Sequence, residues 1–217
     1  MKFTDVSGKT DFVRHAYDRL APEYDRRWRP YIDTTLKAVL ETVQFEGHET
    51  VLDVPCGTGE LEQRMLSEWP DLQITGADLS PGMLRQAGEK DLEKRVKWIK
   101  TDVVSLPLPD AEFDYVICAN SFHYFRRPKE SLVELRRVLR PGGTFILVDW
   151  CDDYLTCKLC SLWLRWTNAA FYRMHSLRGC RSLLEHEGFQ IVDANRFRIN
   201  WLWGLMRFVC RRAADEK

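Results

Sequence analysis

The sequence predicts an α/β fold: a doubly wound, seven-stranded, mostly parallel sheet with helices on both faces and an antiparallel hairpin at its C-terminal edge. Between residues 50 and 150, short apolar runs typical of buried strands alternate with segments of helical spacing, as in chains of strand–helix–strand units. The 217 residues are enough for one domain with a full core and too few for two ordinary ones. We therefore expect a single domain over residues 1–217.

The N-terminal region, residues 10–45, has the spacing of amphipathic helices. Apolar side chains recur every fourth residue from Phe12 to Trp28, and the stripe continues beyond Pro30. The core follows, with strands expected at 50–54, 73–78, 96–100, 113–118 and 144–150 and helices at 59–68, from 80 onward and at 129–139. Ser80 before Pro81 is a typical helix start, and the Pro-Gly-Gly run at 141–143 stops the last of these helices.

The last third of the chain has a different pattern. Residues 151–175 are rich in bulky apolar side chains, and we interpret them as an inserted helix that forms a lid over the substrate. Residues 176–217 contain a helix ended by Gly188 and two strands, 189–199 and 202–210, expected to pair antiparallel at the sheet edge. Sheets of this class bind ligands beyond the carboxyl ends of their strands, where the strand order reverses.

Composition and charge exclude several classes of protein. Lysine plus arginine and aspartate plus glutamate both number 32, so the net charge is zero, which disfavours binding to nucleic acid. No stretch approaches the roughly 20 apolar residues of a membrane span, and the N-terminus lacks the apolar core of a signal peptide. Seven cysteines, an odd number, indicate reduced thiols. We expect a soluble cytoplasmic protein.

The first predicted strand leads into a loop of small residues that begins at Asp53, ends at Gly59 and is followed directly by a helix. Small residues let the backbone turn tightly and approach a ligand, and the helix N-terminus offers free N–H groups. The dinucleotide fingerprint requires a glycine three residues after its second glycine, but the two registers place Glu60 or Glu62 there. A nicotinamide cofactor is therefore disfavoured, and an acidic side chain before the loop suits a cationic ligand.

The run VLDVPCGTG resembles motif I of the class I S-adenosylmethionine-dependent methyltransferases, an acidic residue followed by GxGxG, with Pro55 in place of the first glycine. The resemblance covers about residues 10–150 and is greatest to the small-molecule branch related to quinone biosynthesis (methyltransferase type 11). It implies S-adenosylmethionine as cofactor, with Asp78 at the ribose hydroxyls, Asp102 at the adenine and Asn120 beside the methionine moiety. The full set of cofactor-binding residues that it implies is Tyr17, Tyr24, Asp53, Cys56, Gly57, Thr58, Gly59, Asp78, Leu79, Met83, Asp102, Val103 and Asn120.

The resemblance implies methyl transfer by in-line displacement to a small acceptor. The aromatic content of 151–175 favours an aromatic or lipid-like acceptor, although the same side chains could form core. Candidate catalytic residues are His123, Asp149 and His175, with packing of His123 in its loop and a structural role of Asp149 as alternatives. Transfer of a methyl group needs a general base only for some acceptors.

Several alternatives remain open. One is an amine or phospholipid-headgroup N-methyltransferase, and another is a non-catalytic binding or scaffold protein, which the substitution by Pro55 keeps open. Residues 201–212, rich in tryptophan and arginine, suit peripheral contact with a membrane or an edge hairpin with a basic tail. We expect no metal, because the Cys157–Cys160 pair, with Cys151 and Cys180 nearby, lacks a second ligand pair at comparable spacing.

Overall fold

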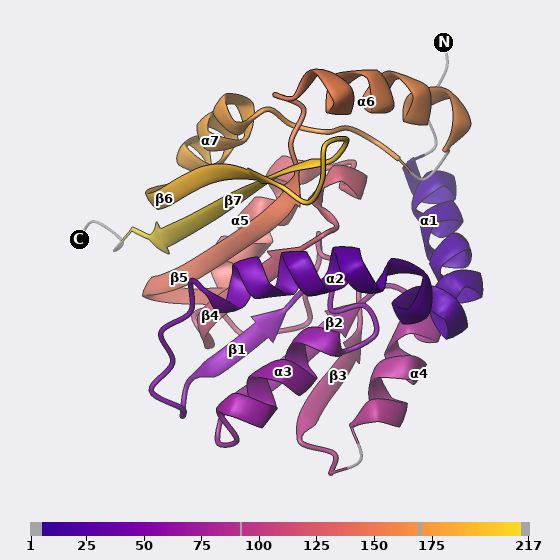
Figure 1. Ribbon diagram of the computed structural model, residues 1–217. Coiled ribbons are helices and arrows are strands. Elements are labelled where there is room, and N and C mark those ends of the chain that lie inside the picture. Colours follow the sequence, from indigo (N-terminus) through magenta and orange to yellow (C-terminus); the bar gives the residue numbers. More distant parts are fainter. Residues whose placement is uncertain (1–5, 92, 169–170, 214–217) are drawn as a thin grey trace.

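The structure, a computed structural model, describes residues 6–91, 93–168 and 171–213 of the chain. Its centre is a seven-stranded sheet of order β3-β2-β1-β4-β5-β7-β6 (Figure 1). The strands are β1 (Thr50–Asp53), β2 (Gln73–Asp78), β3 (Val96–Lys100), β4 (Phe113–Ala119), β5 (Leu139–Trp150), β6 (Phe189–Arg198) and β7 (Gly204–Arg212). Strands β1 to β5 are parallel, whereas β7 is antiparallel to both β5 and β6. The predicted fold class is confirmed.

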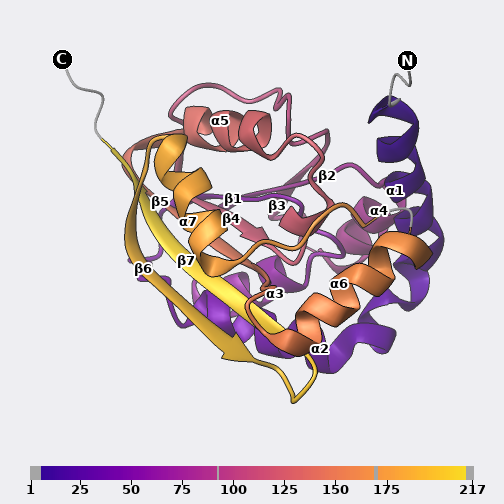
Figure 2. The ribbon, with the colours of Figure 1, turned by 90° about the horizontal axis from the view of Figure 1, so that it is seen from above.

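Helices cover both faces of this sheet (Figure 2). They are α1 (Val6–Leu20), η1 (Ala21–Glu23), α2 (Tyr24–Leu40), α3 (Glu60–Glu68), α4 (Pro81–Lys90), η2 (Phe122–Tyr124), α5 (Pro128–Val138), α6 (Leu155–Thr167) and α7 (Leu177–His186). Apolar side chains of α2 and α3 pack in one core cluster, and those of α5 and α7 pack in the cluster on the opposite face. The two clusters are the buried layers that hold the sheet between its helices.

Local signals in the sequence position the helix starts. The Ser80 hydroxyl accepts a hydrogen bond from Met83 N at 3.1 Å, and Pro81 is the first helical residue of α4. Ser176 caps α7 in the same way, accepting from Gly179 N at 3.0 Å. Each cap satisfies a helix N–H that has no partner within the helix.

The boundary between α5 and β5 differs from the expectation of a helix to 139 and a strand from 144. The helix ends at Val138, and β5 begins at Leu139, which pairs with Phe113 and is fully buried. Pairing resumes between Thr144 and Tyr115 after a register shift. Pro141 lies within this irregular stretch, where a strand tolerates a residue that has no N–H to donate. Burial of Leu139 therefore outweighs the local turn signal.

The C-terminal strands show where residues 201–212 lie in the sheet. Because β7 lies between β5 and β6, its side chains Leu205, Met206 and Phe208 are completely buried. Trp201, in the turn between β6 and β7, is 77% exposed. Most of this segment is thus inner strand, and peripheral contact of residues 201–212 with a membrane stays a prediction. Within the described residues, no helix has the length and apolarity required to cross a bilayer.

Candidate active site

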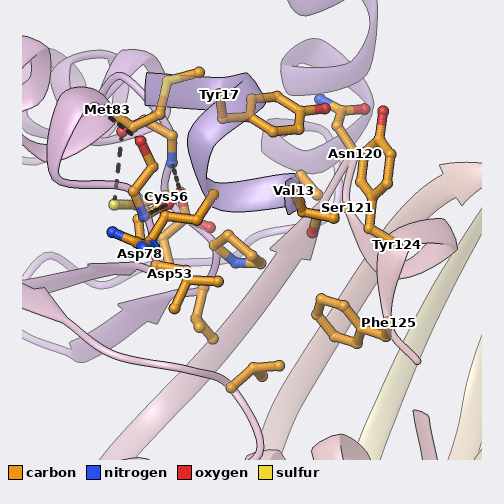
Figure 3. A pocket seen from close by; sticks show the side chains of 18 of the residues that line it. Val13, Tyr17, Asp53, Cys56, Asp78, Met83, Asn120, Ser121, Tyr124 and Phe125 are labelled. Carbon is orange, nitrogen blue, oxygen red and sulfur yellow. Dashed lines mark hydrogen bonds between the residues drawn. The ribbon is translucent and has the colours of Figure 1, made fainter. Parts of the chain in front are cut away.

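A cavity opens at the carboxyl ends of β1, β2 and β4, where neighbouring strands β1 and β4 lead their chains to opposite sides of the sheet. Figure 3 shows two groups of side chains around it. Asp53, Cys56 and Asp78 lie at one end, whereas Tyr17 and Tyr124 lie at the other. The crevice at such a reversal of strand order is the general ligand site of this sheet class.

The loop after β1 has a backbone that only glycine adopts easily at two positions. Gly57 has φ +56° and Gly59 has φ +77°. A Cβ at Gly59 would also lie 3.0 Å from the Cβ of Ala87 and from the ring of Trp98. The preceding Val54–Pro55 peptide bond is cis. These glycines bring the backbone close to the cavity wall and let α3 begin immediately afterwards.

Asp78, the last residue of β2, joins the loops that follow two strands. Its Oδ2 accepts a hydrogen bond from Gly57 N at 3.0 Å, and its Oδ1 accepts one from Ser80 N at 2.7 Å. The side chain is buried but lines the cavity. Burial raises the pKa of this carboxyl to about 6, against the opposing effect of the two N–H donors. Above that pH, Asp78 presents a negative charge to a ligand.

A second pair of carboxyl groups, Asp53 and Glu62, lies beneath the same end. Both are almost completely buried, and Asp53 lines the cavity. The two carboxyl groups hydrogen-bond to each other, which requires that one of them holds a proton. Burial, followed by the neighbouring carboxylates, raises the pKa of Asp53, and burial raises the pKa of Glu62 to about 8. A cationic group of a ligand would stabilise the ionised form of this pair.

The loop after β3 supplies another part of the cavity wall. Asp102 accepts a hydrogen bond at Oδ1 from Val104 N at 3.2 Å, which fixes the turn after β3. Val103 and Met83 are buried and line the cavity with Asp102. An apolar slot edged by one carboxylate suits a flat heterocycle that carries an amino group.

The opposite end of the cavity is aromatic. The rings of Tyr17 and Tyr124 meet edge to face with centres 5.6 Å apart, and Tyr24 lies 6.0 Å from Tyr17. Burial raises the pKa of all three phenols, that of Tyr124 to about 12. They are therefore neutral near pH 7 and offer π faces and hydroxyl groups rather than proton acceptors. Asn120, held at φ +61°, donates from Nδ2 to Thr35 Oγ1 at 2.8 Å beside them.

Two aspartates that the sequence did not single out hold the N-terminal helices over the cavity. Asp18 of α1 accepts hydrogen bonds from the Ser80 hydroxyl at 2.6 Å and from Gly82 N at 2.9 Å. Asp25 of α2 accepts one from the Thr58 hydroxyl at 2.5 Å. For Asp18, one signal was present in the sequence. The predicted helix start at Ser80 has a hydroxyl proton and free N–H groups that need acceptors.

The candidate catalytic residues His123 and Asp149 are brought together, away from the cavity lining. Asp149 accepts hydrogen bonds from the backbone N of His123 at 2.6 Å and from Trp150 N at 2.7 Å, and its Oδ1 lies 2.6 Å from His123 Nδ1. The imidazole stacks on Trp150 with ring centres 3.7 Å apart. His123 and Asp149 are each 1% exposed. In this arrangement they fix the loop that carries Tyr124, and their role in proton transfer stays a prediction.

His175, the third candidate, packs against Phe122 with ring centres 5.2 Å apart. Burial lowers its pKa to about 4, so it is neutral. Among the described residues of this segment, 151–168 and 171–175, none lines the cavity, His175 included. Some bulky side chains of this segment, such as Leu164 and Phe171, pack in a small buried cluster. Others lie exposed on the outer surface. The role of this segment as a lid over the substrate stays a prediction.

The residues implied as cofactor-binding converge on one place, although they come from five separate stretches of sequence. Those that line the cavity are Tyr17, Tyr24, Asp53, Cys56, Gly57, Thr58, Asp78, Leu79, Met83, Asp102, Val103 and Asn120. Gly59 lies next to them at the start of α3. In the described part of the chain, no group of three or more histidine, cysteine, aspartate or glutamate side chains could hold a metal ion.

Comparisons with known proteins agree with this geometry. Residues 51–143 match the family described as "Methyltransferase domain". A demethylmenaquinone methyltransferase of Deinococcus radiodurans is 32% identical in an alignment of 161 positions that covers 67% of this chain and 63% of that protein. The match thus spans less than two thirds of the relative's length.

Solved structures share the fold at low sequence identity. A chain of the complex between the Haloferax volcanii Trm112 methyltransferase activator and the putative methyltransferase has a TM-score of 0.80 at 19% identity, covering 91% of this chain and 97% of that one. The [4+2]-cyclase SpnF has a TM-score of 0.77 at 20% identity, covering 93% and 95%. A fold shared with a cyclase does not by itself fix a reaction. Motif, sheet and family match together show that this chain belongs, through residues 51–143, to the class I S-adenosylmethionine-dependent methyltransferases.

Proposed function

We propose that the protein transfers the methyl group of S-adenosylmethionine to a small aromatic or lipid-like acceptor. The observation that carries the proposal is the division of the cavity into an acidic end with Asp53 and Asp78 and an aromatic end with Tyr17 and Tyr124 (Figure 3). A ligand with hydroxyl and ammonium groups suits the first end, and an apolar acceptor suits the second.

The acidic end fits the cofactor group by group. Asp53 lines the cavity and is hydrogen-bonded to the Glu62 carboxyl, so a ligand ammonium would stabilise its ionised form. Asp78 already fixes Gly57 and Ser80, and its carboxylate retains lone pairs for hydroxyl donors. The slot beside Asp102 suits the adenine ring. S-adenosylmethionine, when bound, supplies a methyl group activated on a positively charged sulfur.

At the aromatic end, the chain's own residues position the acceptor. Tyr17 of α1 and Tyr124 of η2 meet at this end, and Phe125 and Val13 extend its apolar surface. Aromatic walls exclude water and orient a flat acceptor, and the electron-rich ring faces also favour a nearby cationic sulfur. Alignment of two bound reactants can account for much of the rate of a displacement.

The Deinococcus radiodurans relative is a demethylmenaquinone methyltransferase. This supports an acceptor that combines an aromatic ring with a lipid tail. Because the match spans 63% of that protein, the acceptor is proposed as a class rather than as a compound. The lining of the aromatic end is consistent with the ring of such an acceptor.

The test measures the formation of S-adenosylhomocysteine by the full chain with two acceptors, a demethylmenaquinol with a short side chain and phosphoethanolamine. A reaction without acceptor is the blank. Turnover with the quinol alone is the expected result. Turnover with phosphoethanolamine would assign the chain to headgroup N-methylation instead. Tight binding of S-adenosylhomocysteine without turnover on any acceptor of either class would favour a binding or scaffold role.

The catalytic candidates are tested in the same assay. His123→Asn is expected to lower kcat by disturbing the loop of Tyr124, with the shape of the pH profile unchanged. If His123 is instead a general base, the variant will lose the acidic limb of the profile that the wild-type protein shows. His175→Asn tests the third candidate in the same way, since that ring also lies outside the cavity lining.

A further inference from the structure

Helix α6 presents an unusual outer surface. It lies beyond the carboxyl end of β5, on the outside of the molecule (Figures 1 and 2). Five of its large apolar side chains are between 56% and 90% exposed: Leu155, Leu159, Leu162, Trp163 and Trp166. Its inner face is formed by Cys157, Ser161 and Leu164, which are buried. Contiguous exposed apolar surface of this kind marks an interaction site.

The exposed side chains form one stripe. At 3.6 residues per turn, positions 155, 159, 162, 163 and 166 fall within an arc of about 100°. Lys158 and Arg165 project next to one edge of this arc, and both are exposed. Helix α6 contains no acidic residue. The outer surface is therefore apolar along its middle and cationic along one side.

The turn between β6 and β7 continues this surface. Gly204 N donates a hydrogen bond to Cys157 Sγ at 3.1 Å, which joins the turn to the inner face of α6. Arg198 donates to the carbonyl of Trp201 at 2.6 Å and lies over the ring of Tyr154, 4.3 Å from its centre. These contacts hold the exposed Trp201 in a fixed turn beside the start of α6.

Charge is distributed unevenly along the chain. The whole sequence is neutral, but residues 154–184 contain five basic residues, Lys158, Arg165, Arg173, Arg178 and Arg181, and no aspartate or glutamate. Of these, Lys158 and Arg165 lie along the exposed edge of α6 and complement an anionic partner. It would also oppose a symmetric contact between two copies, because the same cationic edge would face itself.

We propose that α6, together with the turn at Trp201, binds the surface of an anionic phospholipid bilayer. A helix with leucine and tryptophan on its outer stripe and cations along the edge matches the helices that lie in the plane of the headgroups. Tryptophan favours that depth, and lysine and arginine are attracted to anionic lipid. This inference goes beyond the proposed methyl transfer and does not depend on it.

The test is cosedimentation of the full chain with vesicles of phosphatidylcholine alone or mixed with phosphatidylglycerol. Binding to the anionic vesicles is expected, and the double variant Trp163→Ser/Trp166→Ser is expected to bind them at least tenfold more weakly. Val133→Ser on α5, which is 52% exposed, is the matched control and should bind as the wild type does. Retained binding of S-adenosylhomocysteine shows that each variant is folded.

Charge is tested separately. Lys158→Glu/Arg165→Glu is expected to weaken binding to anionic vesicles by roughly fivefold or more for each cation removed, whereas Arg26→Glu/Lys37→Glu on α2 should not. The proposal is overturned if the wild type does not sediment with anionic vesicles or if the α6 variants bind them equally well. It is also overturned if light scattering shows a dimer that Trp163→Ser/Trp166→Ser converts to a monomer, which would make a second copy the partner.

Discussion

At the scale of single residues, the Asp78 carboxylate links structure to ligand binding, because it holds Gly57 and Ser80 while facing the cavity. Asp78→Asn is expected to weaken binding of S-adenosylhomocysteine at least tenfold, about 1.4 kcal/mol, since the amide loses both the charge and one acceptor. Calorimetric titration measures the change. Asp71→Asn, an exposed site before β2, is the control and should leave binding unchanged.

The buried Glu62 carboxyl leads to a prediction about how the stability of the fold depends on pH. Its pKa is raised to about 8 by burial, whereas an unfolded chain would release the proton near pH 4.3. Between these values the folded state holds more protons than the unfolded state, so stability falls as pH rises. Glu62→Gln removes this loss, and at pH 8 we expect it to gain at least about 1 kcal/mol, or roughly 2–4 °C in Tm.

Thermal unfolding of the two proteins at pH 5 and pH 8 measures this effect. Glu68→Gln, in the same helix α3 but exposed, is the matched control and should follow the wild type at both values. An equal Tm difference between Glu62→Gln and wild type at pH 5 and pH 8 would contradict the assignment of a protonated carboxyl.

At the scale of elements, α3 can begin directly after the loop only because Gly59 adopts φ +77° against Ala87 and Trp98. Gly59→Ala is expected to destabilise the protein by about 1–2 kcal/mol or more, because a left-handed alanine is strained and its Cβ is crowded. Gly88→Ala within α4 has open space around its Cβ and should be neutral or stabilising by up to about 1 kcal/mol.

Circular dichroism on heating measures both glycine variants, and binding of S-adenosylhomocysteine should weaken only in Gly59→Ala. Equal effects at the two positions would show that loss of a glycine from a helix region, rather than the positive φ, governs the result. The contrast also separates the positive φ required at Gly59, the N-cap of α3, from helix propensity, which favours alanine at Gly88.

At the scale of the whole molecule, ligand binding and folding are coupled, since the cavity joins α1, α2 and the ends of four strands. S-adenosylhomocysteine at 100 times its Kd is expected to add about 2.7 kcal/mol of stability, which is roughly 5–10 °C in Tm. Differential scanning calorimetry measures the shift. NADH should produce none, and a shift with NADH instead would indicate a nicotinamide site.

Much of this fold was predictable because its signals are local. The apolar runs ending in Asp53 and Asp78 mark buried parallel strands, and Ser80 before Pro81 marks the start of α4. The family motif then ordered the strand ends, so the residues expected around the cofactor lie around one cavity. Asp18 and Asp25 were missed because an acidic residue on an amphipathic helix is normally solvated, and its partner is about 30 to 60 residues away.

The sequence by itself determined the order and type of the elements and the loop that forms the cofactor end of the cavity, because backbone preferences and apolar periodicity act between neighbouring residues. Tertiary structure alone decided which side chains meet. Leu139 joined the strand rather than the helix, His123 was buried against Asp149, and the tryptophans of α6 faced outward. Each outcome depends on which surfaces the packed sheet leaves available, and periodicity along one segment does not carry that information.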